Sequence, residues 1–381
     1  MTTNKMTRRD ALRLLSTAPL IPLAGVPALS LLQACATPVQ RVNPVSAAFA
    51  GMPAPNAAEA QATTSVESAL TVAYADGTQR AFKLHYKPLF FTGDRVPDGN
   101  GGTVVAGGYF DANGQPILDR SAGTPTQFFS DCPDGYSLLS PMEAKVPGVQ
   151  GNPVFAVVQF EYTTRDLSGA KMYAQLPSPT AVVTLDQDRT TGALRLVKYS
   201  NVDTSGVHGL WITCGASLSP WNTHLASEEY EPDAVTIAQN RNFQEFSRHF
   251  YGDPNKANPY HYGHIPEVTV HADGTGTVKK HYCMGRISHE VAQVMPDKRT
   301  VLMGDDATNG GLFMFIADRP ADLSSGTLYV AKCSQQSGID LDRGGVFDVE
   351  WIKLGHATSD EVKRLADTLK PADIVDVKSA D

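Results

Sequence analysis

The chain has 381 residues, of which 42% are hydrophobic, 19% charged and 8% aromatic, with a formal net charge of −8. This length can bury a sizeable core, and the 32 glycines and 25 prolines with few charges favour a strand-rich fold over helical bundles. The acidic balance without Lys/Arg runs excludes a nucleic-acid partner, and five cysteines are too few for a disulfide framework in so long a chain.

The N-terminal residues 1–36 are typical of a signal peptide. A twin arginine, Arg8-Arg9, precedes a mostly apolar stretch over residues 14–34. Three prolines within that stretch make it a poor transmembrane or core helix but an acceptable signal sequence. Twin-arginine signals direct the export of folded proteins. We therefore expect a periplasmic or cell-envelope protein.

The end of this signal can be interpreted in two ways. Ala34-Cys35-Ala36 fits a cleavage site before Thr37, whereas Leu32-Gln33-Ala34-Cys35 resembles a lipobox, which would make Cys35 a lipid anchor. Residues 37–60 are rich in proline and alanine and are expected to form a flexible tether. A single domain is then expected over residues 61–381.

The body of the chain consists of short β-rich runs separated by turn dipeptides, which predicts consecutive hairpins. The expected strand pairs are 70–74 with 79–86, 103–110 with 115–118, 181–185 with 194–199, 267–271 with 277–282, and 291–295 with 300–303. Further strands are expected at 155–162, 312–316, 327–332 and 346–354, an extended tail at 374–377, and helices at 242–251 and 359–369. This all-β pattern fits a β-propeller or a large sandwich, between which the pattern alone does not decide.

Acidic residues end or closely follow several apolar runs, at Glu161, Glu228-Glu229, Glu290 and Asp305-Asp306. Adjacent carboxylates repel each other and are expensive to bury without partners. The two doublets therefore belong either to solvated loops or to cation sites. Oxygen ligands of this kind suit Ca²⁺ or Mg²⁺.

Three other residue types near these carboxylates also suggest ion chemistry. Cys214 is either an ordinary buried cysteine or a soft ligand for Fe, Cu or Zn. Arg286 would share a face with Ser288 and Glu290 if the segment is extended, which suits a phosphate site, although a salt bridge explains Arg286 equally well. His224 and His289 are either ligands, phosphate donors or structural residues.

Four segments resemble, in order, landmarks of the PhoX-type alkaline phosphatases, which are exported, twin-arginine-dependent bacterial enzymes. The segments are residues 214–229, 285–290, 303–306 and 325–331, and the resemblance extends over roughly residues 65–355. It implies a β-propeller with a mixed iron–calcium cluster at its axis. One departure is Gln159-Phe160, where family members commonly have Asn-His.

The resemblance also implies residue roles. Cys214 would bind Fe³⁺, and Arg286 and His289 would act on the phosphate. The remaining metal ligands would be Glu161, Glu228, Glu229, Glu290, Asp305 and Asp306, sharing Ca²⁺ and Fe³⁺. Because family members continue beyond residue 381, we expect a propeller-like, incomplete arc of roughly four blades with a half-exposed cluster.

The predicted function is that of an exported, monomeric, metal-dependent alkaline phosphatase acting on small phosphate monoesters. Spontaneous hydrolysis of these dianions is extremely slow, and clustered cations can neutralise the phosphoryl oxygens. Two alternatives stay open. One is a metal-dependent phosphodiesterase or lactonase on the same propeller, and the other is a non-catalytic, calcium-stabilised binding protein of the cell envelope.

Overall fold

The computed structural model describes residues 43–52, 57–58, 65–140, 143–338 and 344–374. The twin arginine, the apolar stretch and Cys35 lie outside the described residues, so the signal and lipid-anchor predictions stay predictions. Among the described residues, no helix is both long and apolar enough to cross a membrane.

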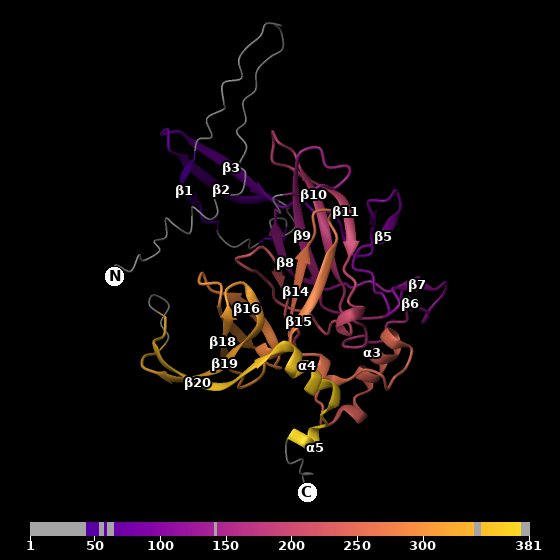
Figure 1. The fold of residues 1–381 in the computed structure, drawn as a ribbon. Coiled ribbons are helices and arrows are strands. Elements are labelled where there is room, and N and C mark those ends of the chain that lie inside the picture. Colours follow the sequence, from indigo (N-terminus) through magenta and orange to yellow (C-terminus); the bar gives the residue numbers. More distant parts are fainter. Residues whose placement is uncertain (1–42, 53–56, 59–64, 141–142, 339–343, 375–381) are drawn as a thin grey trace. The chain divides into compact units, whose positions relative to one another are not determined.

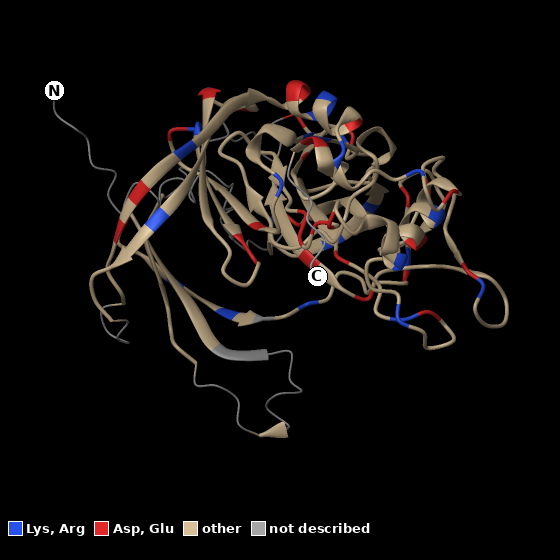
Figure 2. Cartoon of the chain, turned by 90° about the horizontal axis from the view of Figure 1, so that it is seen from below, with Lys and Arg blue, Asp and Glu red and all other residues tan. Residues whose placement is uncertain are grey.

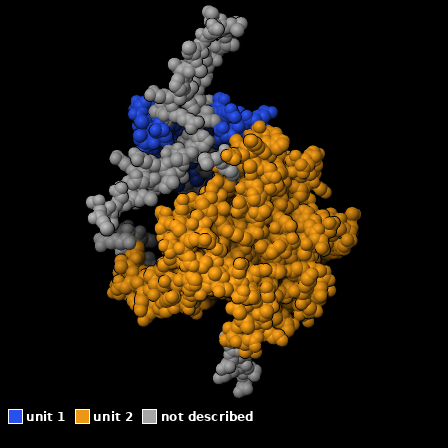
Figure 3. All heavy atoms as spheres, in the orientation of Figure 1, with its two compact units in different colours: residues 1–89, 150–152, 187–195 blue, residues 90–149, 153–186, 196–381 orange. Residues whose placement is uncertain are grey.

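The chain divides into two compact units (Figure 3). The first comprises residues up to 89 together with 150–152 and 187–195. It carries an antiparallel sheet of β1 (Pro44–Phe49), β2 (Ser65–Tyr74) and β3 (Gln79–His85), in that order. The predicted hairpin at Asp76-Gly77 is confirmed as β2–β3. β1 falls within the segment where we expected a tether and pairs with β2.

The second unit is dominated by three antiparallel sheets that follow one another along the chain (Figure 1). The first consists of β8 (Pro133–Leu139), β9 (Asn152–Phe160), β10 (Thr180–Gln187) and β11 (Leu194–Asn201). The second consists of β12 (Ser217–Leu218), β13 (His224–Leu225), β14 (Ile265–Val270) and β15 (Gly276–His281). The third consists of β16 (His289–Val294), β17 (Thr300–Asp305), β18 (Leu312–Arg319), β19 (Asp322–Gln335) and β20 (Phe347–Thr358).

Each of these sheets is a meander in which neighbouring strands are consecutive in sequence. The first strand of each sheet lies at its edge, and β12 lies against both β8 and β16. Consecutive sheets whose first strands lie side by side are the arrangement of propeller blades. The all-β, propeller-like prediction is therefore confirmed, with three such sheets in the described part of the chain where roughly four were expected.

Apolar side chains fill the space between consecutive sheets. One core joins Leu139, Phe155 and Val157 of the first sheet to Val268 of the second. Another joins Leu225 and Ile265 of the second sheet to Val301 and Phe315 of the third. These two cores keep the first strands together, which is what brings their ends to one place.

The smaller elements correct one predicted hairpin. β5 (Thr103–Val105) pairs with β4 (Arg95–Pro97) and not with residues 115–118, because a turn closed by a hydrogen bond from the Asp98 N–H to the Gly102 carbonyl joins the two strands. The turn at Asn113-Gly114 is present, but a single bridge between Phe110 and Pro116 is what closes it. A further pair joins β6 (Leu118–Asp119) to β7 (Thr126–Gln127).

The two predicted helices are confirmed as α3 (Arg241–Tyr251) and α4 (Ser359–Thr368), the latter with the expected Thr358/Glu361 capping box. The remaining helical elements are η1 (Ser205–Val207), η2 (Ile237–Gln239), η3 (Pro259–His261), η4 (Tyr282–Met284) and α5 (Pro371–Ile374). The prediction of an extended tail is wrong at Ile374, which ends α5, and its other residues lie outside the described part.

Candidate metal centre

Strand ends from all three sheets bring acidic residues and one thiol together. Figure 2 marks acidic residues in red on outer loops and also among the crowded strand ends near the middle of the view. Glu161, Cys214 and Glu229 form one group, and Glu229, Glu290 and Asp306 form another; within each group the ligand atoms all lie within 4.8 Å of one another. We call these five residues the acidic cluster.

The backbone places Cys214 at the centre of this cluster. Its N–H donates to the Ser227 carbonyl (3.1 Å), and its carbonyl accepts from the Gly135 N–H (3.1 Å). The neighbouring Gly215 passes so close to β16 that a Cβ there would lie 2.4 Å from the Glu290 carbonyl oxygen. This close approach allows the Cys214 Sγ to donate to the Glu290 Oε2 at 3.0 Å.

Gln159, the departure from the family pattern, supports the same backbone. Its side-chain Nε2 donates to the carbonyl of Cys214, and its Oε1 accepts from the Nε2 of His224 (3.0 Å). His224 is fully buried, which lowers its pKa to about 3, so the ring is neutral and its Nδ1 accepts from the Ser137 hydroxyl (2.9 Å). Of the open roles for His224, the structure thus supports the structural one.

The Glu229 side of the cluster is held by backbone in unusual conformations. The Glu229 N–H donates to the carbonyl of Ile212, and Ile212 (φ 38°) and Tyr230 (φ 46°) both have positive φ values that are rare outside glycine. Such conformations concentrate at functional sites. The Tyr230 hydroxyl donates to Asp306 Oδ2 at 2.8 Å and thereby orients that carboxylate.

The cluster has no positive charge of its own. Within the described residues, no Lys, Arg or His nitrogen lies within 4.0 Å of its carboxylates. Burial, together with the charges of Asp134 and Glu290, raises the pKa of Glu161 to about 7. Burial and a hydrogen bond with Asp306 raise the pKa of Glu229 to about 7 as well.

These properties fit a cation centre. Burial and the neighbouring carboxylates raise the pKa of the Cys214 thiol, so a bound metal would be needed to make it a thiolate ligand. Carboxylates suit hard cations such as Ca²⁺, and the thiol suits a softer ion such as iron. The donor set therefore fits the mixed centre that the resemblance implies.

One residue beside the cluster was missed by the sequence prediction. Asp134 is the second residue of β8, and its Oδ2 lies 3.6 Å from the Cys214 Sγ. Its position directly before Gly135, at the start of a strand, was the available signal. It adds a further carboxylate to the same region and so strengthens the case for a cation.

Two predicted ligands point elsewhere. Glu228 is fully buried, and its Oε1 pairs with the Lys280 Nζ at 2.7 Å and accepts from the Trp211 N–H at 3.0 Å. Its Oε2 accepts from the N–H groups of Gly263 and His264 at 3.0 and 3.1 Å. Asp305 accepts from the Gly311 N–H at 3.3 Å. Neither belongs to the groups of close ligand atoms.

Arg286 also lies apart from the acidic cluster. The backbone bends at Ile287, so Arg286 and Glu290 do not share one extended face. The Arg286 guanidinium donates to the carbonyls of Pro232 and Pro259 and lies over the Tyr260 ring, 5.5 Å from its centroid. No ion pair within 4.0 Å forms at Arg286 among the described residues, but the half-buried Glu231 carboxylate is close enough for its charge to interact with the guanidinium, so the salt-bridge interpretation stays open.

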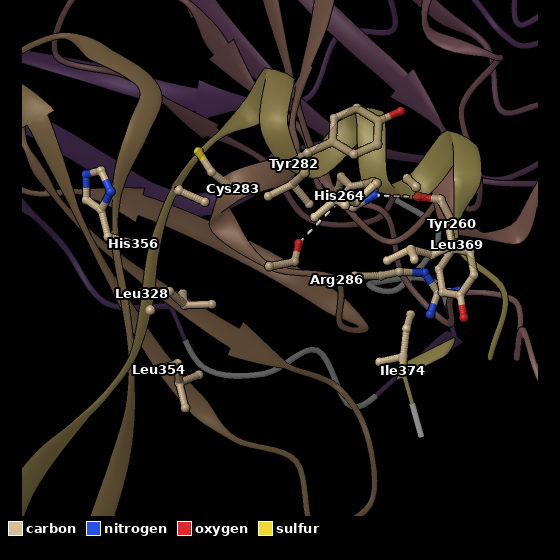
Figure 4. A pocket seen from close by; sticks show the side chains of 16 residues that line it. Tyr260, His264, Tyr282, Cys283, Arg286, Leu328, Leu354, His356, Leu369 and Ile374 are labelled. Atoms are coloured by element: carbon tan, nitrogen blue, oxygen red, sulfur yellow. Dashed lines mark hydrogen bonds between the residues drawn. The ribbon is translucent and has the colours of Figure 1, made fainter. Parts of the chain in front are cut away.

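Figure 4 shows Arg286 at one side of a cavity of about 450 Å³. The walls are mostly apolar and include Leu328, Leu354 and Leu369. His289 is fully buried, and this burial lowers its pKa to about 4. Its Nε2 lies 3.3 Å from the Gly285 carbonyl oxygen. The structure thus ties both predicted phosphate residues to backbone carbonyls and brings neither into the groups of close ligand atoms.

Residues 182–378, just over half of the chain, match the family described as Alkaline phosphatase PhoX. The chain belongs to this family of alkaline phosphatases. The matched span includes Cys214, Glu229, Glu290 and Asp306.

No curated protein matches the chain. Among solved structures, it is similar to a putative 6-phosphogluconolactonase from Bacteroides uniformis, with 10% identity, 82% of each chain covered and a TM-score of 0.26. A likeness at this level does not bear on the function.

Proposed function

We propose that the protein is an exported alkaline phosphatase that hydrolyses small phosphate monoesters with Ca²⁺ and Fe³⁺ held by the acidic cluster. Family membership supports the reaction class. The observation that carries the metal dependence is a pair of ligand groups that share Glu229. One group contains Glu161 and the Cys214 thiol and the other contains Glu290 and Asp306, and no ion pair with a basic side chain involves them in the described residues.

The charge of the cluster supports this dependence directly. A phosphate monoester is a dianion, and four carboxylates without cations would repel it. Bound Ca²⁺ and Fe³⁺ would supply the Lewis-acid charge that neutralises the phosphoryl oxygens and the leaving group. The role left to the protein is to keep the ligands in place and to choose the ions.

The side chains around the cluster suit that role. Cys214 would select iron, while the carboxylates would take calcium. The Tyr230 hydroxyl orients Asp306, and the Ser227 hydroxyl donates to the Glu290 carbonyl at 2.7 Å, which fixes the strand that carries this ligand. Such supporting hydrogen bonds commonly raise metal affinity 10–100-fold.

Arg286 and His289 remain proposed contacts of the phosphate group. Both are tied to carbonyl oxygens, so they would have to leave those partners to reach a substrate. Replacing Arg286 with Lys tests this role, because a phosphate contact predicts a higher KM with little change in melting temperature. A lower melting temperature with an unchanged KM would assign Arg286 a structural role.

Export through the twin-arginine pathway, a periplasmic or envelope location and a monomeric state complete the proposal. The Arg8-Arg9 pair supports the first two. Replacing both arginines with lysines should keep the protein in the cytoplasm, as measured by cell fractionation. Replacing Cys35 with Ser should release the protein from membranes if Cys35 is lipidated.

The test of the activity is hydrolysis of p-nitrophenyl phosphate at alkaline pH by the purified full chain. We expect calcium-dependent activity that a chelator removes and added Ca²⁺ restores. Hydrolysis that is insensitive to chelation would overturn the metal dependence. Bis(p-nitrophenyl) phosphate and a lactone, assayed in parallel, distinguish the diesterase and lactonase alternatives. A calcium-sensitive melting temperature without any hydrolysis would indicate a binding protein.

A further inference from the structure

A second group of metal-binding side chains lies outside the acidic cluster. His208 follows η1, His261 ends η3, and Asp367 lies in the last turn of α4, so the three come from distant parts of the chain. One ligand atom from each lies within 4.8 Å of the other two. We propose that His208, His261 and Asp367 form a second metal site that takes Zn²⁺ or a similar borderline divalent cation.

The distances between these side chains are close to those of a coordinated ion. The His261 Nε2 lies 3.2 Å from the Asp367 Oδ1. Two ligands bound to zinc at tetrahedral angles, with bonds of about 2.1 Å, are separated by about 3.4 Å. The His208 ring stacks on the His261 ring with centroids 3.8 Å apart and planes at 11°. The two imidazoles thus lie face to face beside the Asp367 carboxylate, with one ligand atom of each of the three residues within 4.8 Å of the others.

Tyrosine hydroxyls support both imidazoles in the way that metal-bound histidines require. The Nδ1 of His208 lies 3.2 Å from the Tyr251 hydroxyl, and the Nδ1 of His261 lies 3.2 Å from the Tyr282 hydroxyl. Metal-ligating histidines almost always engage their second nitrogen with such a partner, which fixes the ring. In both residues, this leaves Nε2 as the nitrogen for the ion.

The electrostatics around Asp367 favour a cation. A carboxylate in the last turn of a helix faces the negative end of the helix dipole, and no basic residue occupies that turn of α4. Burial lowers the pKa of His208 and lowers that of His261 to about 4, so both rings are neutral and available as ligands. Lys280 also faces the site, but its positive charge is compensated by Glu228, whose Oε1 lies 2.7 Å from the Lys280 Nζ. The positive charge of Lys363 acts against binding of the ion.

An ion at this position would fasten α4 to the propeller-like body. Asn258, next to η3, already donates from its Nδ2 to the Ala366 carbonyl at 2.8 Å, beside Asp367. Val362 of α4 packs against the core between the second and third sheets. Two neutral nitrogens with one carboxylate suit Zn²⁺ better than the hard Ca²⁺, so the two sites would take different ions.

The experiment measures Zn²⁺ binding to the metal-stripped full chain by calorimetry, in the presence of excess Ca²⁺. A Glu229→Gln background weakens Zn²⁺ binding to the acidic cluster, which separates this proposal from the proposed function. We expect one equivalent of Zn²⁺ and a raised melting temperature. Co²⁺ should give ligand-field absorption bands typical of nitrogen and oxygen donors.

Matched variants identify the ligands. In the same background, His208→Ala should abolish binding of the one equivalent of Zn²⁺. Asp367→Asn, at an exposed side chain, should weaken the Zn²⁺ affinity by about tenfold or more. Tyr282→Phe should weaken it while leaving the stoichiometry at one. Asp360→Asn in the first turn of α4 and the exposed His271→Ala are controls that should change nothing. Equal Zn²⁺ affinity in all these variants, or no Zn²⁺ binding by the folded Glu229→Gln protein, would overturn the proposal.

Discussion

Glu228 and Glu229 are neighbours in sequence, and both are almost completely buried, yet they belong to two different regions. Glu228 lies in an ion-pair core, where Lys280 and three backbone N–H groups engage both of its oxygens. Glu229 lies in the acidic cluster among carboxylates and a thiol. The Glu228 carboxylate therefore has an ion-pair partner within the fold, whereas no ion pair in the described residues involves Glu229.

The second acidic doublet repeats this division. Asp305, the last residue of β17, accepts one backbone hydrogen bond, whereas Asp306 joins the cluster. Successive side chains of an extended segment point to opposite sides, so only one member of a doublet can face a given site. In both doublets it is the second residue that does so.

The largest expected effect comes from removing the carboxylate of the ion-pair core. Glu228→Ala leaves the fully buried Lys280 ammonium without a counter-charge and should lower the free energy of unfolding by about 3–5 kcal/mol. Urea denaturation of the metal-free protein measures this loss. Lys280→Met in the Glu228→Gln background should lose less than the sum of the two single changes, because the charge and its partner leave together. Additive losses would contradict the pairing.

Glu229→Gln should have the opposite profile. It removes a group shared by both parts of the acidic cluster, so phosphatase activity should fall by about a hundredfold or more, since even supporting residues of metal sites contribute 10–100-fold. The metal-free protein should not be destabilised at pH 8, because a buried, unpaired charge is removed. Activity close to that of the unchanged protein, or a stability loss like that of Glu228→Ala, would erase the distinction between the regions.

The sequence predicted strands and hairpins well where turn chemistry is local. Asp273-Gly274 between β14 and β15 is an example, because Asp273 accepts from the N–H and hydroxyl of Thr275 within the turn itself. The hairpin expected after residue 103 was wrong because β5 forms a hairpin with β4 instead, through a turn in which Asp98 accepts from the N–H groups of Asn100 and Gly102. This turn chemistry is local as well, and the Asp98-Gly99 dipeptide was the signal that the prediction overlooked.

The candidate site was predicted in residue type but not in side-chain direction. Glu161, Cys214, Glu229, Glu290 and Asp306 come together as the resemblance implied. The placement of Glu228 depended on Lys280, which lies more than 50 residues away in sequence and could not be paired with it from the pattern. The group of His208, His261 and Asp367 was missed for the same reason, because its three members lie in separate segments.

Cys214 tests the chemical identity of the cluster. Cys214→Ala should remove bound iron and its visible absorption, as measured by elemental analysis and spectroscopy, with activity falling sharply. Its cost in unfolding free energy should stay at about 1–2 kcal/mol, because the side chain is only half-buried and makes weak hydrogen bonds. Cys283→Ala is the matched control, since Cys283 is buried in the apolar core and should not affect iron. Unchanged iron content in Cys214→Ala would make it a core residue.

The calcium dependence of the pH profile of stability tests the acidic cluster without mutation. Glu161 and Glu229 have pKa values raised from 4.5 to about 7 in the folded, metal-free protein. These two carboxyl groups therefore bind more protons in the folded than in the unfolded state between these values, so their contribution to stability falls as the pH rises from about 4.5 to 7. Buried histidines such as His224 and His289, whose pKa values are lowered, contribute a rise over part of that range with or without calcium. Excess Ca²⁺ should abolish the decline from the two carboxyl groups because a bound cation favours the charged carboxylates. Thermal melts with and without calcium across this range measure it, and identical profiles would argue against a cation at the cluster.

The smallest effect is expected at Asp305, and it tests the division of the doublets most directly. Asp305→Asn keeps an oxygen that can accept from the Gly311 N–H, so we expect a stability change within about 0.5 kcal/mol and an activity change below about twofold. Asp306→Asn, one residue further on, changes a carboxylate that lies beside Glu229 and accepts a hydrogen bond from the Tyr230 hydroxyl. This change should lower the calcium affinity about tenfold. Calcium titration of activity compares the two variants. If Asp305→Asn weakened calcium as much as Asp306→Asn, both members of the doublet would bind the ion, and alternation along the strand would not determine which carboxylates are ligands.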